Sequence, residues 1–260
     1  MTLRDRSELA TAKRVVVKVG SSSISGVNES KIEQLVDALA KAHASGVEVI
    51  LVSSGAIATG MPLLGIEAKP DDLATSQALA SVGQSRLISR YQQSLERFGI
   101  VAGQVLLTSG DLEAAETREN AKRAMDKLVS LRVLPIVNEN DTVATQEIRF
   151  GDNDRLAALV AVLVEADALV LLSDVDALYD MPPTKPGAKR ISVVKFGEDL
   201  VDIEIGGSST NVGTGGAVTK VSAAKIATES GVAVLLTSTD QVSLALDGAE
   251  VGTWFEAATK

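Results

Sequence analysis

The sequence predicts an α/β fold, a three-layer sandwich with a mostly parallel central sheet flanked by helices. Short runs of β-branched and apolar residues alternate with helical patterns of a dozen or more residues, as βαβ crossovers require. Most of the predicted strands end in small or polar residues, which is where parallel sheets gather their ligand-binding groups. A chain of 260 residues is long enough to bury a large core.

The first half of the chain shows this alternation clearly. The N-terminal dozen residues read as a loose arm or a first helical turn, and Asn28 or Ser30 is placed to cap the first long helix. The predicted elements, in order, are strand 14–19, a helix ending at Gly46, strand 47–52, a long helix after Pro70, strand 100–107 and helix 113–131.

The second half repeats the pattern without an internal repeat or a clear domain boundary. The predicted elements are strand 133–137, a helix capped by Asp152, strand 168–172, strand 191–195, helix 217–230 and a last strand, 232–236. We therefore expect one domain, 1–260. Its most plausible internal division lies near Ser173, where the strand–loop–helix order restarts.

Composition excludes several classes of function. The formal net charge is -9 and no basic stripe is present, so nucleic acid is not expected as a partner. Without cysteine, the chain has no disulfide, thiolate zinc site or cysteine nucleophile. The N-terminus lacks the apolar core of a signal peptide, and no apolar run is long enough to cross a bilayer. A cytoplasmic protein without membrane contact is predicted.

The single histidine, His43, limits the chemistry further. A Ser-His-Asp triad or a multi-histidine metal site would need this residue. His43 shares a helical face with apolar residues, which is typical of an ordinary helix-edge histidine. The reaction is therefore expected to need no histidine base.

The stretch from Val133 to Asp154 combines an apolar strand with two polar clusters. The strand runs directly into Asn138-Glu139-Asn140-Asp141, and Gly151-Asp152-Asn153-Asp154 follows ten residues later at the start of a helix. Amides and carboxylates in such numbers cannot stabilise a core, because each would cost a few kcal/mol if buried without a partner. They predict the wall of a site that binds a polar small molecule.

Five predicted strand ends carry small or polar groups. In a parallel sheet these ends point the same way, so their side chains are expected to converge at one edge. The five are residues 18–21, Ser53-Ser54-Gly55, residues 138–141, Ser173-Asp174 and the glycine-rich loop 213–220.

Two of these ends indicate an anionic ligand. Gly213-Thr214-Gly215-Gly216, followed by Lys220, resembles a phosphate-binding loop at a helix N-terminus, although it matches neither the Walker nor the dinucleotide spacing. Lys18 interrupts a valine strand. Such a lysine is often an edge or snorkelling side chain, but Gly-Ser-Ser after it makes it a candidate phosphate contact.

These residues carry a resemblance to the amino acid kinase family, and within it to the glutamate 5-kinases. The segments that resemble it run from about residue 14 to residue 236. They are VVVKVGSSS, VILVSSGAIATG, QALASVGQSRL, GQVLLT, PIVNENDTVATQEIRFGDNDRLAA, LVLLSDVDALY and VGTGGAVTK. Of these, NENDTVA, FGDND and GTGG with the following TK are specific to the subfamily.

The resemblance implies ATP-dependent phosphorylation of the γ-carboxylate of L-glutamate to L-glutamyl 5-phosphate, the first step of L-proline biosynthesis. It also implies Mg²⁺, carried largely by the nucleotide phosphates. A cytoplasmic homo-oligomer inhibited by L-proline is implied as well. Residues 1–172 would form the glutamate-binding part and residues 173–260 the ATP-binding part.

The resemblance also implies roles for single residues. Lys18 and Lys220 would be catalytic and contact ATP, with Asp154 orienting both lysines. Ser54, Asp141 and Asn153 would bind glutamate. The remaining ATP-binding residues would be Ser173, Asp174, Thr214, Gly215, Gly216, Ala217, Val218 and Thr219.

The chemistry of the residues agrees with this assignment. A carboxylate with a pKa of roughly 4.3 is already ionised at neutral pH, so phosphoryl transfer to it needs no base. The transfer depends on positioning and on neutralising charge, which two lysines, Mg²⁺ and glycine amides supply. Asp141 and Asn153 offer acceptors to an α-ammonium group, and Ser54 offers a donor to a carboxylate.

Some features depart from the family pattern. Because the sequence ends at Lys260, we do not expect the PUA domain that many relatives carry. Ser76 and Ala217 stand where lysine and methionine are common, and the loop after Tyr179 is short. Ser54 could also simply end a strand, and Asn153 could share the helix-capping role of Asp152. Two alternatives remain open: a related kinase acting on N-acetylglutamate, aspartate or carbamate, and an inactive nucleotide- or amino-acid-binding regulator.

Overall fold

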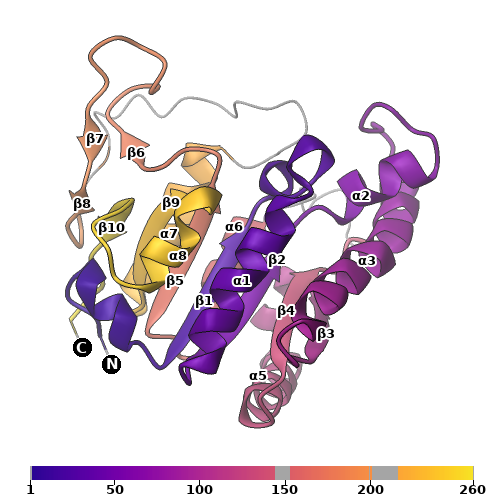
Figure 1. Cartoon of the computed structure of the whole chain (residues 1–260), viewed down its shortest axis with the longest axis horizontal. Helices are drawn as coiled ribbons and strands as arrows, with labels where there is room; N and C mark the ends of the chain where they lie inside the picture. Colours follow the sequence, from indigo (N-terminus) through magenta and orange to yellow (C-terminus); the bar gives the residue numbers. More distant parts are fainter. Residues whose placement is uncertain (1, 144–152, 199, 201–215, 260) are drawn as a thin grey trace.

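A computed structural model describes residues 2–143, 153–198, 200 and 216–259 of the chain. Eight strands of these residues form one sheet in the order β3-β4-β2-β1-β5-β9-β10-β8 (Figure 1). In that order they span Ala102–Leu107, Leu134–Glu139, Glu48–Ser53, Arg14–Val19, Ala168–Ser173, Ala233–Ser238, Thr253–Phe255 and Val193–Val194. Two further strands, β6 (Leu178–Tyr179) and β7 (Arg190–Ile191), form a separate antiparallel pair.

Pairing in the large sheet is parallel from β3 to β9. β10 then runs antiparallel to β9, and β8 runs parallel to β10. The predicted mostly parallel sheet is confirmed. Because β1 lies between β2 and β5, its carboxyl end is at the centre of the polar edge, flanked by the ends of both neighbours.

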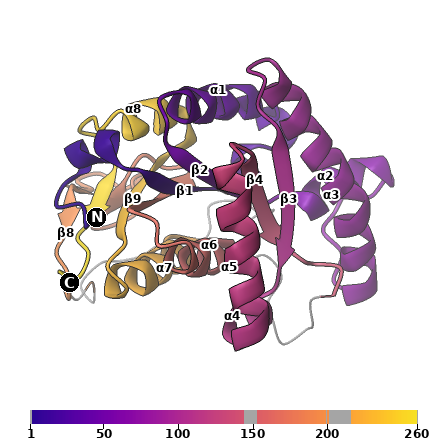
Figure 2. The same cartoon turned by 90° about the horizontal axis from the view of Figure 1, so that it is seen from below.

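Helices cover both faces of the sheet (Figure 2). The α-helices are α1 (Lys31–Ala44), α2 (Ala56–Leu63), α3 (Leu73–Glu96), α4 (Ser109–Glu113), α5 (Ala115–Ser130), α6 (Asn153–Leu163), α7 (Ala217–Glu229) and α8 (Val242–Leu246). The short 3-10 helices are η1 (Arg6–Thr11), η2 (Ser21–Ser23), η3 (Gly26–Asn28) and η4 (Thr239–Gln241). One core cluster joins the sheet to α1, α3 and α8, and a second joins its other face to α5, α6 and α7. The three-layer sandwich is confirmed.

Several predicted boundaries were wrong. The helix predicted over 113–131 is α5, which begins two residues later, at Ala115, because Ala114 is extended. A short helix that was not predicted, α4, precedes it and starts at a capping box between Thr108 and Asp111. The strand predicted over 191–195 is divided between β7 and β8. The strand predicted to be last, β9, is followed by α8 and β10. Ser30 occupies the N-cap position of α1, but its side chain makes no cap hydrogen bond. The predicted cap Asp152 lies outside the described residues.

The N-terminal arm is a short helix, η1, that is fastened to the far end of the sheet. The buried guanidinium of Arg6 donates hydrogen bonds to the carbonyl oxygens of Val251, Gly252 and Ser192. It therefore ties the start of the chain to its last strand.

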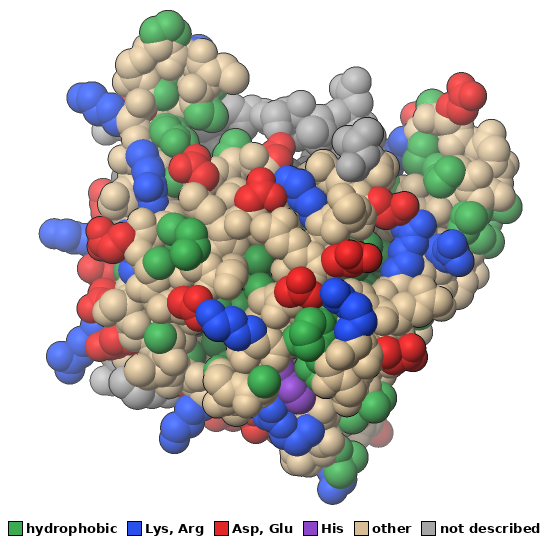
Figure 3. Space-filling model, viewed as in Figure 1, with side chains coloured by type: hydrophobic (Ala, Val, Ile, Leu, Met, Phe, Trp, Pro, Cys, Tyr) green, Lys and Arg blue, Asp and Glu red, His purple; other side chains and the backbone are tan. Residues whose placement is uncertain are grey.

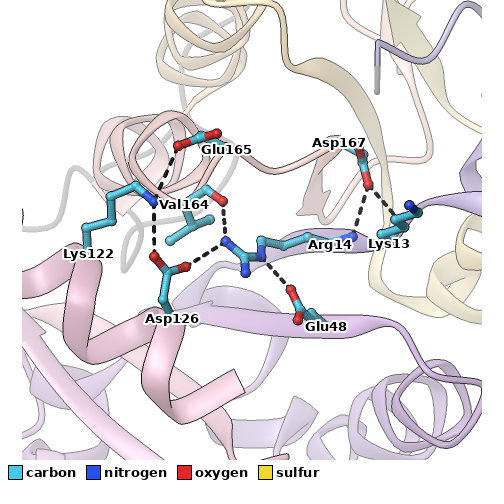
Figure 4. A network of polar contacts seen from close by, with 8 residues as sticks. All are labelled: Lys13, Arg14, Glu48, Lys122, Asp126, Val164, Glu165 and Asp167. Atoms are coloured by element: carbon cyan, nitrogen blue, oxygen red, sulfur yellow. Dashed lines mark hydrogen bonds and ion pairs between the residues drawn. The ribbon is translucent and has the colours of Figure 1, made fainter. Parts of the chain in front are cut away.

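A network of polar contacts stands at the amino ends of the strands, away from the polar edge (Figure 4). Arg14 forms ion pairs with Glu48 at 2.7 Å and with Asp126 at 2.8 Å, and it donates to the carbonyl oxygen of Val164 at 2.6 Å. Lys122 extends the network from α5 to Asp126 and Glu165. These contacts anchor the last turn of α6, whose first turn lies at the opposite edge of the sheet.

The surface of the face shown in Figure 3 carries interspersed acidic and basic side chains without a large patch of either sign. Among the described residues, no helix is both long enough and apolar enough to span a membrane. The single histidine behaves as predicted: His43, on α1, contacts the carbonyl oxygen of Arg132 at 3.1 Å.

Candidate active site

Two lysines meet one aspartate at the polar edge of the sheet. The ammonium nitrogen of Lys18 lies 2.7 Å from Oδ1 of Asp154, and that of Lys220 lies 3.2 Å from Oδ2. All three residues are nearly buried, with exposed fractions of 4%, 2% and 6% for Lys18, Asp154 and Lys220. Residues from β1, α6 and α7, far apart in the sequence, thus share one ion-paired cluster.

The alternation of β1 explains why Lys18 reaches this cluster. Val15, Val17 and Val19 belong to the core on the α1 side, and Val16 belongs to the core on the α6 and α7 side. Lys18 is two residues from Val16 and so faces the same side. The buried-strand prediction for this segment is confirmed, and the snorkelling alternative for Lys18 is wrong, because its ammonium group is buried in an ion pair.

Asp154 is held in its ionised form. Burial by itself raises the pKa of a carboxyl group, but the charges of Lys18 and Lys220 and hydrogen bonds from Lys18 and Thr219 outweigh it. The pKa of Asp154 is therefore well below its usual range. The hydroxyl of Thr219 lies 2.7 Å from Oδ2 of Asp154, on the same oxygen as Lys220. The carboxylate thus fixes both lysine heads and the first turn of α7.

The N-terminus of α7 lies beside these lysines. Gly216 is the N-cap residue, and no described side chain caps the helix. The first N–H groups of a helix have no partner within the helix and attract anions. Of the predicted loop, Gly216, Ala217, Val218 and Thr219 lie at this helix start, whereas Thr214 and Gly215 lie outside the described residues.

Strand β5, which pairs with β1 on the side opposite β2, ends at Ser173, and Asp174 follows it. The hydroxyl of Ser173 donates to the carboxylate of Asp174 at 3.1 Å. Ser173 is buried at the carboxyl end of β5, and Asp174 is exposed. Because β5 pairs with β1, this pair lies at the same edge as Lys18, in keeping with the predicted nucleotide side.

The end of β2 turns sharply at Ser54 and Gly55. The backbone N–H of Ser54 donates to the carbonyl oxygen of Val19, which extends the β1–β2 ladder to the edge. Gly55 has a φ of 105°, a left-handed conformation that suits glycine. Directly after it, α2 begins without a side-chain cap, so the first amides of α2 have no partner within the helix, and the hydroxyl of Ser54 is a further potential donor at this turn.

Acceptor groups collect at the end of β4. Asp141 and Asn153 are buried, and Oδ1 of Asp141 has no hydrogen-bond partner among the described residues. Burial and the nearby charge of Glu139 raise the pKa of Asp141 to about 7, against the opposing charge of Lys69. Oδ1 therefore has room for a hydrogen bond that no described residue makes, and a bound ammonium group could donate it.

A cavity of about 200 Å³ opens beside these acceptors. Its walls come from the start of α2, from α3, from β3 and from the turn after β4, and the residues that line it include Ala56, Gln84, Gln104, Glu139 and Asp141. The cluster of Lys18, Asp154 and Lys220 and the acceptor-lined cavity thus lie at the same edge of the sheet.

Comparison with known proteins supplies the family. The family model described as the amino acid kinase family matches residues 13–238. The chain belongs to the amino acid kinase family.

Close relatives within this family carry one name. The chain is 68% identical to the glutamate 5-kinase of Clavibacter sepedonicus over 98% of both chains. It is 64% identical to the glutamate 5-kinase of Leifsonia xyli subsp. xyli, over 99% of this chain and 96% of that protein. For the glutamate 5-kinase of Thermobifida fusca the identity is 54%, over 97% of this chain and 66% of that protein. The predicted resemblance is confirmed, as is the enzyme class, a kinase.

Solved structures agree on the fold. The carbamate kinase from Giardia lamblia bound to AMP-PNP superposes with a TM-score of 0.68 at 15% identity, covering 96% of this chain and all of that one. An isopentenyl phosphate kinase gives a TM-score of 0.66 at 18% identity, covering 93% and 99%. At these identities the likeness shows the fold alone.

Sequence reasoning missed two buried polar residues in this family member. Asn138 was grouped with its polar neighbours but given no role, and Gln84 was noted only as part of a motif. The amide nitrogen of Asn138 donates to Oε1 of Gln84 at 2.7 Å. One signal was present: Gln84 precedes Leu87 by three residues and so falls on the apolar face of its helix, where a polar side chain needs a partner.

Proposed function

We propose that this chain is a glutamate 5-kinase, which transfers the γ-phosphoryl group of ATP to the γ-carboxylate of L-glutamate. The products are L-glutamyl 5-phosphate and ADP, in the first step of L-proline biosynthesis. The names of its near relatives support the reaction. The single structural observation that carries it is the buried cluster of Lys18, Asp154 and Lys220, which lies at the same edge as Asp141, whose buried Oδ1 has no hydrogen-bond partner among the described residues.

The proposed reaction needs positive charge near the transferring phosphoryl group and no base. A γ-carboxylate oxygen of glutamate forms a bond to the γ-phosphorus, and the bond from that phosphorus to the oxygen that bridges to the β-phosphate breaks. No proton moves, because the acceptor is already ionised. Lys18, Lys220 and the first amides of α7 stabilise the negative charge on the transferring group, and Asp154 keeps both lysine heads in place.

Mg²⁺, which we propose is bound through the nucleotide phosphates, would add charge neutralisation at the same group. Within the described ranges, no cluster of three or more His, Cys, Asp or Glu side chains could hold a metal ion. The donor set, two lysines, hydroxyls and helix amides, fits phosphate oxygens. Ser173, Asp174 and residues 214–220 are proposed to bind ATP.

Glutamate is proposed to bind beyond the carboxyl ends of β2 and β4, which are neighbours in the sheet. Asp141 and Asn153 accept hydrogen bonds from its ammonium group, and Ser54 with the following amides donates to a carboxylate. The buried Oδ1 of Asp141 supports this assignment, since a cationic substrate group would give it the partner that the described residues do not.

We also propose that the enzyme is a cytoplasmic homo-oligomer that L-proline inhibits, and that residues 1–172 bind glutamate while residues 173–260 bind ATP. The resemblance of the motifs supports these points. Light scattering during gel filtration would measure the assembly, and rates with added L-proline would measure the inhibition.

The activity is tested by measuring ADP release with L-glutamate, while hydroxylamine traps the acyl phosphate as a hydroxamate. L-Glutamate should give equal amounts of ADP and hydroxamate. N-acetyl-L-glutamate, which lacks the ammonium group, should give neither. Activity with the acetylated acid but not with L-glutamate would refute the proposal, as would ADP release without hydroxamate.

A further inference from the structure

A hydrogen bond joins helix α3 to the end of β4 at the wall of the cavity beside the proposed glutamate site. The donor is the amide nitrogen of Asn138 and the acceptor is Oε1 of Gln84, 2.7 Å apart. The exposed fractions of the two residues are 1% and 9%. A buried amide that loses such a partner keeps the cost of its desolvation, so this bond fixes the orientation of the Asn138 side chain.

Asn138 passes this constraint to the residues that face the substrate. Its Oδ1 accepts from the backbone N–H of Glu139 at 2.9 Å, and Oδ1 of Asn153 lies 3.3 Å from the same nitrogen. Gln84 on α3 is thus connected, through Asn138 and the backbone of Glu139, to the first residue of α6. Asp154, which holds both lysines, is the next residue.

Helix α3 itself has little freedom to shift. A methyl group at Gly83 would lie 1.8 Å from the carbonyl oxygen of Ala56, and one at Gly60 would lie 2.2 Å from that of Leu79. Helices α2 and α3 therefore pack backbone to backbone next to Gln84. The acceptor that Asn138 uses is fixed relative to the Ser54–Gly55 turn, from which α2 begins.

We propose that Gln84 is a positioning residue for the amino acid substrate: it acts through Asn138 to hold Asn153 and the turn that carries Asp141 in their binding geometry. This inference rests on the proposed function and assigns to Gln84, which lines the cavity beside the acceptor groups, a role that acts through Asn138. It predicts that loss of the Gln84 oxygen weakens glutamate binding while leaving ATP binding and the chemical step nearly intact.

The test compares two glutamines of the same helix. Gln84→Met removes the acceptor with little change of side-chain size. Gln92→Met is the matched control, because Oε1 of Gln92 also ties α3 to the sheet, accepting from the backbone N–H of Ala102 at 2.9 Å. It stands eight residues further along, roughly 12 Å away at 1.5 Å per residue. Gln84→Asn, which retracts the amide by one methylene, is a second variant should Gln84→Met not fold.

KM for L-glutamate should rise about fivefold in Gln84→Met and in Gln84→Asn, the size of one lost neutral hydrogen bond. KM for ATP and kcat should stay within about twofold of the wild type, and Gln92→Met should leave all three constants near the wild type. An equal change in KM for glutamate in Gln84→Met and Gln92→Met would overturn the inference. Weaker packing of α3 against the sheet, common to both variants, would then explain the change in KM.

A double-mutant cycle separates action through Asn138 from direct contact with substrate. Once Asn138→Ala is in place, adding Gln84→Met should change KM for L-glutamate by less than about twofold. A full additional rise would show that Gln84 acts independently of Asn138 and would overturn the positioning role. Absence of L-glutamate-dependent ADP release by the wild type would instead refute the proposed function itself, so the two failures are distinguishable.

Discussion

The raised pKa of Asp141 predicts a pH-dependent affinity for the amino acid. The substrate ammonium needs an ionised partner, and burial together with Glu139 raises the pKa of Asp141 from 3.8 to about 7. Below pH 7 a growing fraction of free enzyme carries a protonated Asp141. KM for L-glutamate should therefore rise nearly tenfold per pH unit at low pH, or roughly 30-fold between pH 8 and pH 5.5.

The same shift predicts a dependence of stability on pH. The pKa of Asp141 in the folded state lies above its value in the unfolded state, so the folded state binds this proton more tightly. The resulting contribution to the free energy of unfolding is fully present below about pH 4 and is lost as the pH rises through 7. A shift of this size corresponds to about 4 kcal/mol in the free energy of unfolding at high pH. Asp141→Asn removes the charge and keeps the shape, so its ligand-free form should be more stable than the wild type at pH 8. This advantage should largely vanish at pH 4.

The assay measures initial rates against L-glutamate concentration from pH 5.5 to 8, together with urea unfolding across pH 4 to 8. Asp141→Asn should show a high KM that does not vary with pH, close to that of the wild type at low pH. Asp71→Asn, at an exposed position before α3, is the control and should retain the wild-type profile. A pH-independent KM in the wild type would refute the reasoning. So would an Asp141→Asn variant less stable than the wild type at pH 8.

Three further substitutions test other parts of the site. Asp154→Asn removes the carboxylate that pairs with two buried ammonium groups, so kcat should fall at least about 100-fold and the free energy of unfolding by roughly 3 kcal/mol. Urea unfolding and steady-state rates measure both, and near-wild-type rates would contradict the role of Asp154. Lys220→Ala should reduce kcat far more than it raises KM for L-glutamate, and equal losses in rate assays would argue against charge stabilisation of the transferring group. Gly83→Ala should lower the thermal midpoint by several degrees, because its methyl group would overlap the carbonyl oxygen of Ala56, and an unchanged midpoint would show that α2 moves freely.

Local sequence was enough to predict which segments form the main strands and which edge of the sheet carries the candidate site. Lys18 stands out because a lysine inside a valine run has no place in an apolar core, and the sheet confirms that its neighbours on both sides also end in polar residues. The lysine–aspartate cluster was predicted from motif resemblance rather than from spacing. The residues come from three elements, and nothing local to any of them gives the distances between them.

Elements that depend on tertiary contacts were not predictable. Helix α2 contains Gly60 and Pro62, which disfavour a helix, and it forms against α3, where glycines allow backbone contact. Strand β10 has only three residues and depends on pairing with β9 and β8. Gln84 falls on the buried face of a periodic helix, but its partner Asn138 is 54 positions away, and only the folded sheet brings them together.

The measurement that tests the account most directly follows the oxygen of the acceptor. L-Glutamate labelled with ¹⁸O in both γ-carboxylate oxygens is phosphorylated in the presence of hydroxylamine, and the released phosphate is analysed by mass. Because hydroxylamine attacks the acyl carbon, the phosphate should retain one ¹⁸O atom from glutamate, with one ADP formed per phosphate. Phosphate without label would mean that water, not the γ-carboxylate, accepts the phosphoryl group, and would contradict the account.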